Sequence, residues 1–381
     1  MNSQPILADL TQNMNLETDS EIDCQVTSNG HFADGIPISK AVMPNGKSIS
    51  LLKTMITSAC EKNCYYCPFR AGRDFRRATF TPDKLAHTFM RIYYAKAVEG
   101  VFLSSGVLNG GVSSQDKLID TAEILRSKYE YRGYLHLKLM PGVEKDQVER
   151  AMMLASRISI NLEAPNECRL KLLAPKKNFS EELIQPLKWA EQIRRNKSPH
   201  KNWNGLWPSS TTQFVVGAVG ETDMEIISTS EKLFSQLNLK RVYYSKFNPI
   251  EDTPLENHPA ENPWRQHRLY QSSYLLRDYG FSLEEMPFDP EGNLPLETDP
   301  KIAWAKGNLT EDPIEINKAE KEELIRIPGI GHKGVQSILQ NRKHHKVKSI
   351  QQLKRMGIGT KNARDFILLD GKRPARQTSF L

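Results

Sequence analysis

Residues 51–68 read Leu-Leu-Lys-Thr-Met-Ile-Thr-Ser-Ala-Cys-Glu-Lys-Asn-Cys-Tyr-Tyr-Cys-Pro. The apolar and β-branched start predicts a strand, and the polar remainder predicts a loop that carries Cys60, Cys64 and Cys67. These three thiols have no obvious fourth ligand. A structural zinc site closes with four Cys or His ligands, and a bacterial ferredoxin run has a shorter first gap and a fourth cysteine. The loop therefore suits an iron–sulfur cluster that keeps one iron open.

An alternative interpretation is that the three thiols are reduced and packed as small hydrophobic residues. The loop is too polar for this, because Glu61, Lys62 and Asn63 stand among the cysteines. The remaining cysteines, Cys24 and Cys168, are isolated, and we interpret them as buried or bystander thiols. Five cysteines in 381 residues do not make a disulfide framework, which predicts a reducing compartment.

Length and composition predict one large domain and a small one. Hydrophobic residues make up 39% of the chain, enough for a sizeable core. The N-terminus lacks the basic start and apolar run of a secretion signal, and no apolar stretch reaches the roughly 18 residues of a membrane span. We therefore expect a soluble, cytoplasmic protein with no membrane partner. The predicted parts are an irregular N-terminal extension at 1–47, an α/β barrel at 48–283, a Pro- and acid-rich linker at 284–313, a helical domain at 314–371 and a basic tail at 372–381.

Six short apolar or alternating runs are separated by longer helical patterns, an order that predicts parallel strands joined by crossover helices. The predicted strands are Leu51–Thr57, Val101–Ser105, Tyr134–Met140, Ile158–Glu163, Thr212–Gly217 and Arg241–Phe247.

Two of these strands alternate aliphatic and polar residues, so that each has two different faces. If the aliphatic face lies under the helices, then His136, Lys138, Ser159, Asn161 and Glu163 point into the barrel. Barrel interiors are ordinarily filled with apolar layers, so this pattern favours an open lumen that holds a ligand. Mutual hydrogen bonding of these polar groups is the alternative.

Positive charge is concentrated at the C-terminus. Residues 314–381 contain 15 Lys and Arg against 6 Asp and Glu, which gives this segment a net charge of +9. The whole chain has a net charge of +7, so the residues before 314 sum to −2. Such a block indicates a polyanion partner, most often nucleic acid, and a merely solvated tail is the alternative.

A helix, a turn with the sequence Pro328-Gly329-Ile330-Gly331 and a second helix are predicted within this basic block, with Asn317 able to cap the first helix. The pattern resembles the helix-hairpin-helix DNA-binding module, although Val335 stands where that module usually has a small residue. The resemblance implies that Pro328, Gly329, Ile330, Gly331 and Lys333 bind DNA through its phosphate backbone, without sequence specificity. A helical protein-interaction module is the alternative.

The cysteine spacing, with Tyr66 just before the last cysteine, resembles the signature of the radical S-adenosylmethionine (SAM) superfamily. Members fold as partial TIM-like (βα)6 barrels with the cluster loop after the first strand. The resemblance implies a [4Fe-4S] cluster on Cys60, Cys64 and Cys67, and SAM on the open iron. Reductive cleavage of SAM would give a 5′-deoxyadenosyl radical, which abstracts hydrogen from the substrate. An electron donor such as flavodoxin or ferredoxin would then be a partner.

The same resemblance implies a set of SAM contacts. These are Tyr66 beside the adenine, Ser104, Ser105 and Gly106 at the end of the second strand, Asn161 and Glu163 near the ribose, and Gly217 near adenine. The second strand of the superfamily usually ends in Gly-Gly-Glu, so the carboxylate that contacts the methionine amino group is missing here. The hydrogen-abstracting position and any other catalytic residue stay unknown.

Four arginines follow the cysteine loop, namely Arg70, Arg73, Arg76 and Arg77. The sequence leaves three roles open for them. They could hold nucleic-acid phosphates, lie in a solvated loop, or screen the negative charge of a cluster.

Nearly the whole chain after residue 47 resembles one radical SAM group, described as DNA modification or repair proteins whose genes accompany a uracil-DNA-glycosylase-like protein. Our main hypothesis is a radical SAM enzyme that acts on a nucleotide in DNA, with that glycosylase-like protein as a possible partner. A second hypothesis moves the radical chemistry to RNA or to a partner protein. A third is a non-catalytic DNA-binding iron–sulfur protein, with Cys24 as the residue to suspect as fourth ligand.

Overall fold

The computed structural model describes residues 4–11, 14, 36–42 and 48–375. The chain forms two compact units. Residues 1–221 and 232–262 make the first, here called the barrel unit, and residues 222–231 and 263–381 make the second, the helical unit.

The barrel unit is built on one seven-stranded sheet. Its strands are β1 (Ile38–Val42), β2 (Ser48–Met55), β3 (Gly100–Ser104), β4 (Tyr134–Lys138), β5 (Arg157–Ser159), β6 (Ser209–Val216) and β7 (Arg241–Lys246). Neighbours in the sheet follow chain order, and every pair from β2 to β7 is parallel. Parallel strands in unbroken chain order, joined by helices, form an α/β partial barrel, which confirms the predicted fold class.

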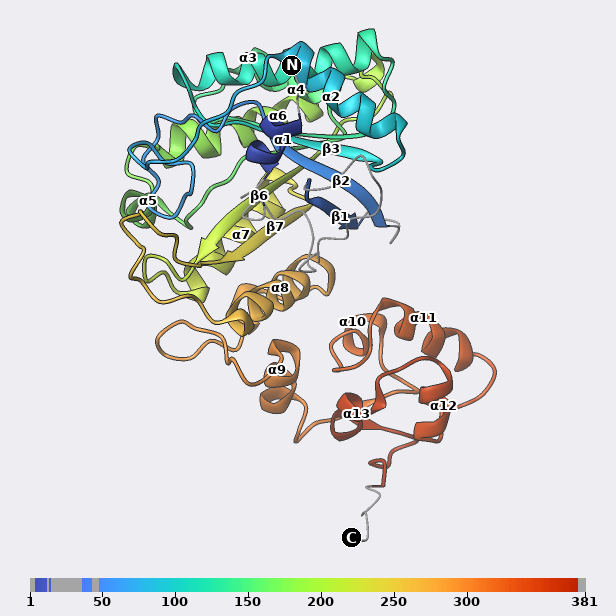
Figure 1. Cartoon of the computed structure of the whole chain (residues 1–381). Helices are drawn as coiled ribbons and strands as arrows, with labels where there is room; N and C mark the ends of the chain where they lie inside the picture. The colour runs from blue at the N-terminus through green and yellow to red at the C-terminus, as the bar shows by residue number, and fades with distance from the viewer. Residues whose placement is uncertain (1–3, 12–13, 15–35, 43–47, 376–381) are drawn as a thin grey trace. The chain divides into compact units, whose positions relative to one another are not determined.

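Helices connect the parallel strands, and Figure 1 shows α2, α3, α4 and α6 grouped together on one side of them. The helices that begin in this unit are α1 (Gln4–Thr11), α2 (Pro82–Tyr94), α3 (Gly110–Glu123), α4 (Lys145–Leu154), α5 (Glu167–Leu173) and α6 (Gln185–Asn196), and α7 (Asp223–Leu237) is shared between the units. Helix α2 illustrates how local sequence determines a helix. Thr81 caps its first turn, Pro82 fixes its start, and Leu85 and Phe89 lie buried on one face.

Two expectations for the barrel unit need correction. The extension at 1–47 is not wholly irregular, because it contains α1 and the edge strand β1, which pairs antiparallel with β2. Ser39 and Lys40 give β1 a polar character that suits an edge and hides its strand pattern. The predicted strand Ile158–Glu163 is also interrupted after Ser159. The Ile160 N–H still donates to the Thr211 carbonyl, at 3.4 Å. The Thr212 hydroxyl then donates to the Ile160 carbonyl at 2.7 Å and accepts from the Leu162 N–H at 3.1 Å, before pairing resumes at Glu163.

The helical unit contains α8 (Pro263–Asp278), α9 (Pro300–Asn308), α10 (Lys321–Leu324), α11 (His332–Asn341), α12 (Ile350–Arg355) and α13 (Thr360–Ala363), with the short strands β8 (Ile314–Glu315) and β9 (Ile367–Leu368). A hydrophobic core joins them, and Ala305 and Leu309 of α9 belong to the same core as Ile330 and Val335. Helix α9, which lies within the predicted linker at 284–313, therefore packs into this unit.

The hairpin consists of α10, the turn at 328–331 and α11. Asn317 does not cap its first helix. Glu320 is the N-cap of α10. The Asn317 side chain instead donates to the Val347 carbonyl at 3.0 Å and accepts from the Val347 N–H at 2.7 Å. It therefore ties together two loops that are 30 residues apart in the chain, a contact that no local pattern predicts.

Candidate functional site

The ends of β2, β3, β4 and β5 meet at one edge of the sheet, as the carboxyl ends of parallel strands must. They enclose a cavity of about 80 Å³. Its lining includes most of the residues selected from the sequence, namely Cys60, Cys64, Cys67, Tyr66, Ser104, Ser105, Gly106, Lys138, Asn161 and Glu163. The structure thus brings the three thiols and the polar strand ends to one place.

Backbone hydrogen bonds fix the cysteine loop against the next strand. The Gly106 N–H donates to the Thr57 carbonyl at 2.7 Å, and the Glu61 N–H donates to the Val107 carbonyl at 2.8 Å. A Cβ atom on residue 106 would lie 2.1 Å from the carbonyl oxygen of Ala59. Only glycine allows the two backbones to approach this closely.

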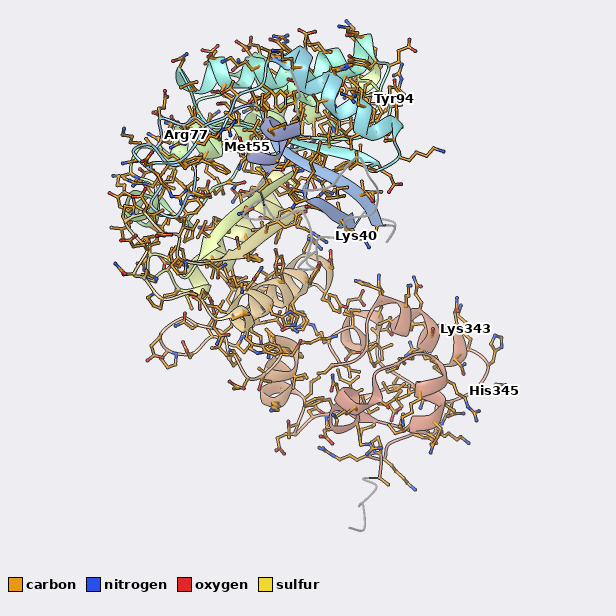
Figure 2. The ribbon with its side chains drawn as sticks, viewed as in Figure 1. Lys40, Met55, Arg77, Tyr94, Lys343 and His345 are labelled. Carbon is orange, nitrogen blue, oxygen red and sulfur yellow. The ribbon has the colours of Figure 1, made fainter. Side chains whose placement is uncertain are left out.

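Arg77 holds the loop from the other side. Its guanidinium donates to the carbonyls of Ser58, Phe69, Arg70 and Arg73, and it lies 3.8 Å from the centre of the Phe75 ring. The guanidinium therefore shapes the cysteine loop, a role that the sequence did not suggest, and its donors are engaged by the backbone rather than by a phosphate. Figure 2 labels this side chain in the barrel unit.

The other three arginines differ from one another. Arg73 donates to the carbonyls of Glu251 and Pro68, at 3.0 and 3.1 Å. Arg76 has a side chain that is 76% exposed and pairs with Asp9 at 3.4 Å. Arg70 lies with its guanidinium 5.9 Å from the Tyr65 ring centre. Arg76 is therefore open to solvent, whereas Arg70 and Arg73 are half-buried.

A buried ion pair forms one wall of the cavity. The Lys177 ammonium donates to the Glu163 carboxylate at 2.8 Å, and the two side chains are only 9% and 3% exposed. Burial by itself would raise the pKa of Glu163, but the ammoniums of Lys177 and Lys138 hold that pKa below its ordinary value. The second carboxylate oxygen of Glu163 is buried without a hydrogen-bond partner in the described structure. It is therefore able to accept a hydrogen bond from a ligand.

Glu163 is also held in an uncommon backbone conformation, with φ of +66°. A left-handed conformation in a residue other than glycine costs free energy, and such positions concentrate at functional sites. The interruption after Ser159 and this conformation together turn the carboxylate toward the cysteine loop, whose Tyr66 has its pKa raised by burial and by Glu163.

The two interpretations of the polar strand faces, an open lumen and mutual hydrogen bonding, each hold for some of the residues. His136, Ser159 and Asn161 are buried as expected. The His136 Nε2 atom lies 2.8 Å from the Ser159 hydroxyl, so this pair satisfies itself. Lys138, Asn161 and Glu163 instead line the cavity.

Two contacts in the cavity favour the thiolate form of Cys64 and Cys67, which an iron–sulfur cluster requires. Burial raises the pKa of Cys64 and of Cys67, and the Lys177 ammonium opposes this rise at both. The Phe69 N–H donates to the Cys67 sulfur at 3.4 Å, a contact that favours the thiolate form. Among the described residues, no three His, Cys, Asp or Glu side chains are placed to hold a single metal ion. A four-iron cluster makes a different demand, because each thiolate binds its own iron.

Gly217 and Cys168 lie apart from this arrangement. Gly217 is not among the residues that line the cavity. A side chain there would collide with the Glu261 carboxylate, which explains the glycine by packing. Cys168 is exposed on α5, and Cys24 lies outside the described residues.

The hairpin residues form a second candidate site in the helical unit. Pro328–Gly331 lies between α10 and α11, and Ile330 is buried in the hydrophobic core. Gly329 has φ of +81°, and a Cβ atom on it would lie 2.2 Å from the Gly359 carbonyl oxygen. The Gly359 N–H donates to the Gly329 carbonyl at 3.1 Å, so the two Gly-Ile-Gly turns of the sequence contact each other.

Several basic side chains of the helical unit are exposed. Val335 is accommodated in the core, while Lys333 is exposed at the start of α11. Figure 2 shows Lys343 and His345 projecting from the segment between α11 and α12. These side chains are available to a polyanion.

Lys177 is the main residue of the cavity that the sequence did not reveal. It stands in a Pro-Lys-Lys turn beside Lys176, and nothing local distinguishes the two lysines. Lys176 contacts the Glu61 carbonyl at the surface, whereas Lys177 is buried. The sequence offered one indirect indication of this lysine, because a carboxylate such as Glu163 that is buried in a barrel needs a cation as its partner.

One family model matches part of the helical unit, and the other comparisons with known proteins are distant. A helix-hairpin-helix motif model matches residues 310–364. An uncharacterized protein of Methanocaldococcus jannaschii is 27% identical over 238 residues, which cover 60% of this chain and 58% of that protein. No helix of the described residues is long and apolar enough to cross a membrane.

Similar solved structures include a methylornithine synthase, with 14% identity, a TM-score of 0.48, and coverage of 60% of this chain and 61% of that one. Another is a radical SAM methyltransferase from Sphaerobacter thermophilus, with 13% identity, a TM-score of 0.46, and coverage of 66% and 74%. The match thus spans about three fifths of the length of the Methanocaldococcus jannaschii protein and of the methylornithine synthase. These likenesses concern the fold alone.

Proposed function

We propose that this protein is a radical SAM enzyme that holds a [4Fe-4S] cluster on Cys60, Cys64 and Cys67 and acts on nucleic acid, with DNA as the substrate. The observation that carries the proposal is the single cavity that contains three thiols and the polar ends of three further strands. When bound, and given one electron from an external reductant, the cluster and SAM would supply the abstraction of a hydrogen atom from the substrate.

The residues of the chain hold charge and exclude water in this proposal. Lys177 and Arg77 lie near the thiols and favour their anionic form, and Arg77 also fixes the loop. Met55, Leu139 and Ile160 give the cavity an apolar wall, which shields a reactive species from solvent. Glu163 offers its second carboxylate oxygen to SAM, and Ser105, Gly106 and Asn161 line the cavity beside it.

The helical unit supports the choice of nucleic acid. A helix-hairpin-helix motif matches 310–364, and residues 314–381 carry a net charge of +9. Phosphate contacts of this kind position a nucleic acid without selecting a sequence.

The test compares anaerobically reconstituted wild type with Cys64→Ser and with Cys168→Ser, a matched change at an exposed cysteine. Iron content and release of 5′-deoxyadenosine are measured with SAM and a strong reductant. We expect Cys64→Ser to lose both and Cys168→Ser to keep both. If wild type binds a cluster but never cleaves SAM, the enzyme proposal fails and a structural or sensing cluster takes its place. If release rises with RNA or with a protein partner but not with DNA, the choice of DNA fails.

A further inference from the structure

A groove of about 1010 Å³ lies within the helical unit, outside the cysteine cavity. It is bounded by the end of α8, the start of α9 and the hairpin. Its lining includes Tyr279, Asp299, Lys301, Gly329, Gly331 and His332. Lys301 belongs to α9 and therefore lies outside residues 310–364, which the hairpin motif covers.

Lys301 is a buried cation with neutral partners. The residue is 9% exposed, its ammonium donates to the Ile330 carbonyl at 2.8 Å, and the nitrogen lies 4.6 Å from the centre of the Tyr279 ring. Within the described part of the chain, no ion pair is formed by this lysine. A buried ammonium without a counter-ion is costly, so the arrangement points to an anion that completes it.

The charged groups around Lys301 are already engaged. The Asp299 carboxylate caps α9, where it accepts from the N–H groups of Lys301 and Ile302 at 2.9 and 3.2 Å. Asp278 pairs with Arg277 at 2.7 Å. Burial lowers the pKa of Lys301 to about 7, and the Asp299 carboxylate opposes this only in part. None of these carboxylates neutralises the ammonium by direct contact.

Donors for an anion are present on the hairpin side of the same groove. Helix α11 has ten residues and begins after Gly331, which has no side chain to cap it. Its first N–H groups therefore have no side-chain acceptor, and they favour a negative group. His332 also lines the groove, with its ring centre 5.2 Å from that of Tyr279.

We propose that Lys301 and the first turn of α11 together hold one phosphodiester group of DNA in this groove. The hairpin supplies backbone donors, and Lys301 in its protonated form supplies positive charge from outside the motif. The inference rests on the proposed nucleic-acid function and deepens it, because it assigns the phosphate a specific buried cation.

The test uses the full chain and a labelled DNA duplex, with affinity measured by fluorescence anisotropy at several salt concentrations. Lys301→Met keeps the aliphatic stem and removes the charge. Lys306→Met makes the same change at an exposed position of the same helix. We expect Lys301→Met to weaken binding by about tenfold and to lower the salt dependence by about one counter-ion, with Lys306→Met within about twofold of wild type. The advantage of wild type over Lys301→Met should shrink as the pH rises above 7 and the ammonium loses its proton.

Thermal unfolding separates binding from structure. Removal of an unpaired buried charge should leave the melting temperature of Lys301→Met unchanged or raise it. A lower melting temperature together with weak binding would show a structural lysine and overturn the inference. Equal affinity of Lys301→Met and Lys306→Met for DNA would overturn the inference as well and would leave the nucleic-acid function intact.

If wild type itself binds no DNA at low salt, the inference and the proposed nucleic-acid function both fail. SAM cleavage without DNA still tests the rest of the proposed function. Excess inorganic phosphate should compete only weakly, and full displacement by it would indicate a small-anion site instead.

Discussion

The barrel unit and the helical unit each bury a lysine at a candidate site, but they treat its charge differently. Lys177 is paired with the Glu163 carboxylate at 2.8 Å, and it also lies near the thiol of Cys64. Lys301 donates to a backbone carbonyl at 2.8 Å and faces a tyrosine ring.

The difference is informative about what each site receives. At the cysteine cavity, the Glu163 carboxylate balances the ammonium of Lys177 within the protein. At the groove, no described carboxylate contacts the Lys301 ammonium, and burial lowers its pKa to about 7. This contrast is the basis for proposing a resident cofactor at the first site and a substrate phosphate at the second.

The largest expected effect comes from breaking the paired lysine. Lys177→Met leaves Glu163 buried without its cation, which should lower the free energy of unfolding by about 3–5 kcal/mol. The double variant Lys177→Met/Glu163→Gln should regain most of that loss, because neither charge remains. Urea unfolding of the three proteins measures the coupling. Additive losses in the double variant would show that the pair is not the source of the effect.

Gly329→Ala should come next, because it forces both a positive φ and a collision with Gly359. We expect a loss of about 1–3 kcal/mol in unfolding free energy. Gly357→Ala is the matched control, since residue 357 has φ of +78° and open space around its Cβ position. Its loss should be smaller, and thermal unfolding compares the two. Equal losses would mean that the contact between the two turns adds nothing.

Arg77→Lys tests the support of the cysteine loop. The substitution keeps the charge but cannot reach the four carbonyls that Arg77 contacts, so we expect a loss of about 1–3 kcal/mol. Slower iron incorporation during reconstitution should accompany it. Arg76→Lys, at a side chain that is 76% exposed, serves as the control and should change neither quantity. A normal rate of iron incorporation in Arg77→Lys would show that this arginine does not shape the cluster site.

The smallest effect is a pH dependence at Lys301. Its pKa is about 7 in the folded protein and about 10.4 in an unfolded chain, so between these values the unfolded state binds more protons. The contribution of Lys301 to stability therefore rises with pH across this window and is lost as the pH falls through 7. Lys301→Met should lack this rise, so that its advantage in melting temperature near pH 7 fades by pH 9. Parallel curves for the two proteins would contradict the assignment.

The sequence predicted the barrel well because its signals are local. Each of the six predicted strands overlaps an observed one, and the polar alternation around Lys138 and Asn161 placed both at the cavity. The cysteine loop was equally easy to find, since a pattern of three cysteines in eight residues depends on spacing alone.

The contacts that were missed are long-range. Strand β1 is polar at the sheet edge, and α9 follows a stretch rich in Pro and acidic residues, so neither carries a strong pattern. Lys177 and Lys301 are ordinary lysines until the fold buries them. The choice between a solvated charge and a buried one depends on partners that are distant in sequence, such as Ile330 for Lys301, 29 residues away.

The most direct test of the proposed function is 5′-deoxyadenosine release as a function of duplex DNA concentration, in cluster-loaded wild type and Lys301→Met. We predict release that rises with DNA in both proteins. The variant should need about tenfold more DNA to reach the same maximum, because its cysteine cavity is unchanged while its phosphate site is weakened. No release from wild type under any condition, or release that ignores DNA, would contradict a radical SAM enzyme that acts on nucleic acid.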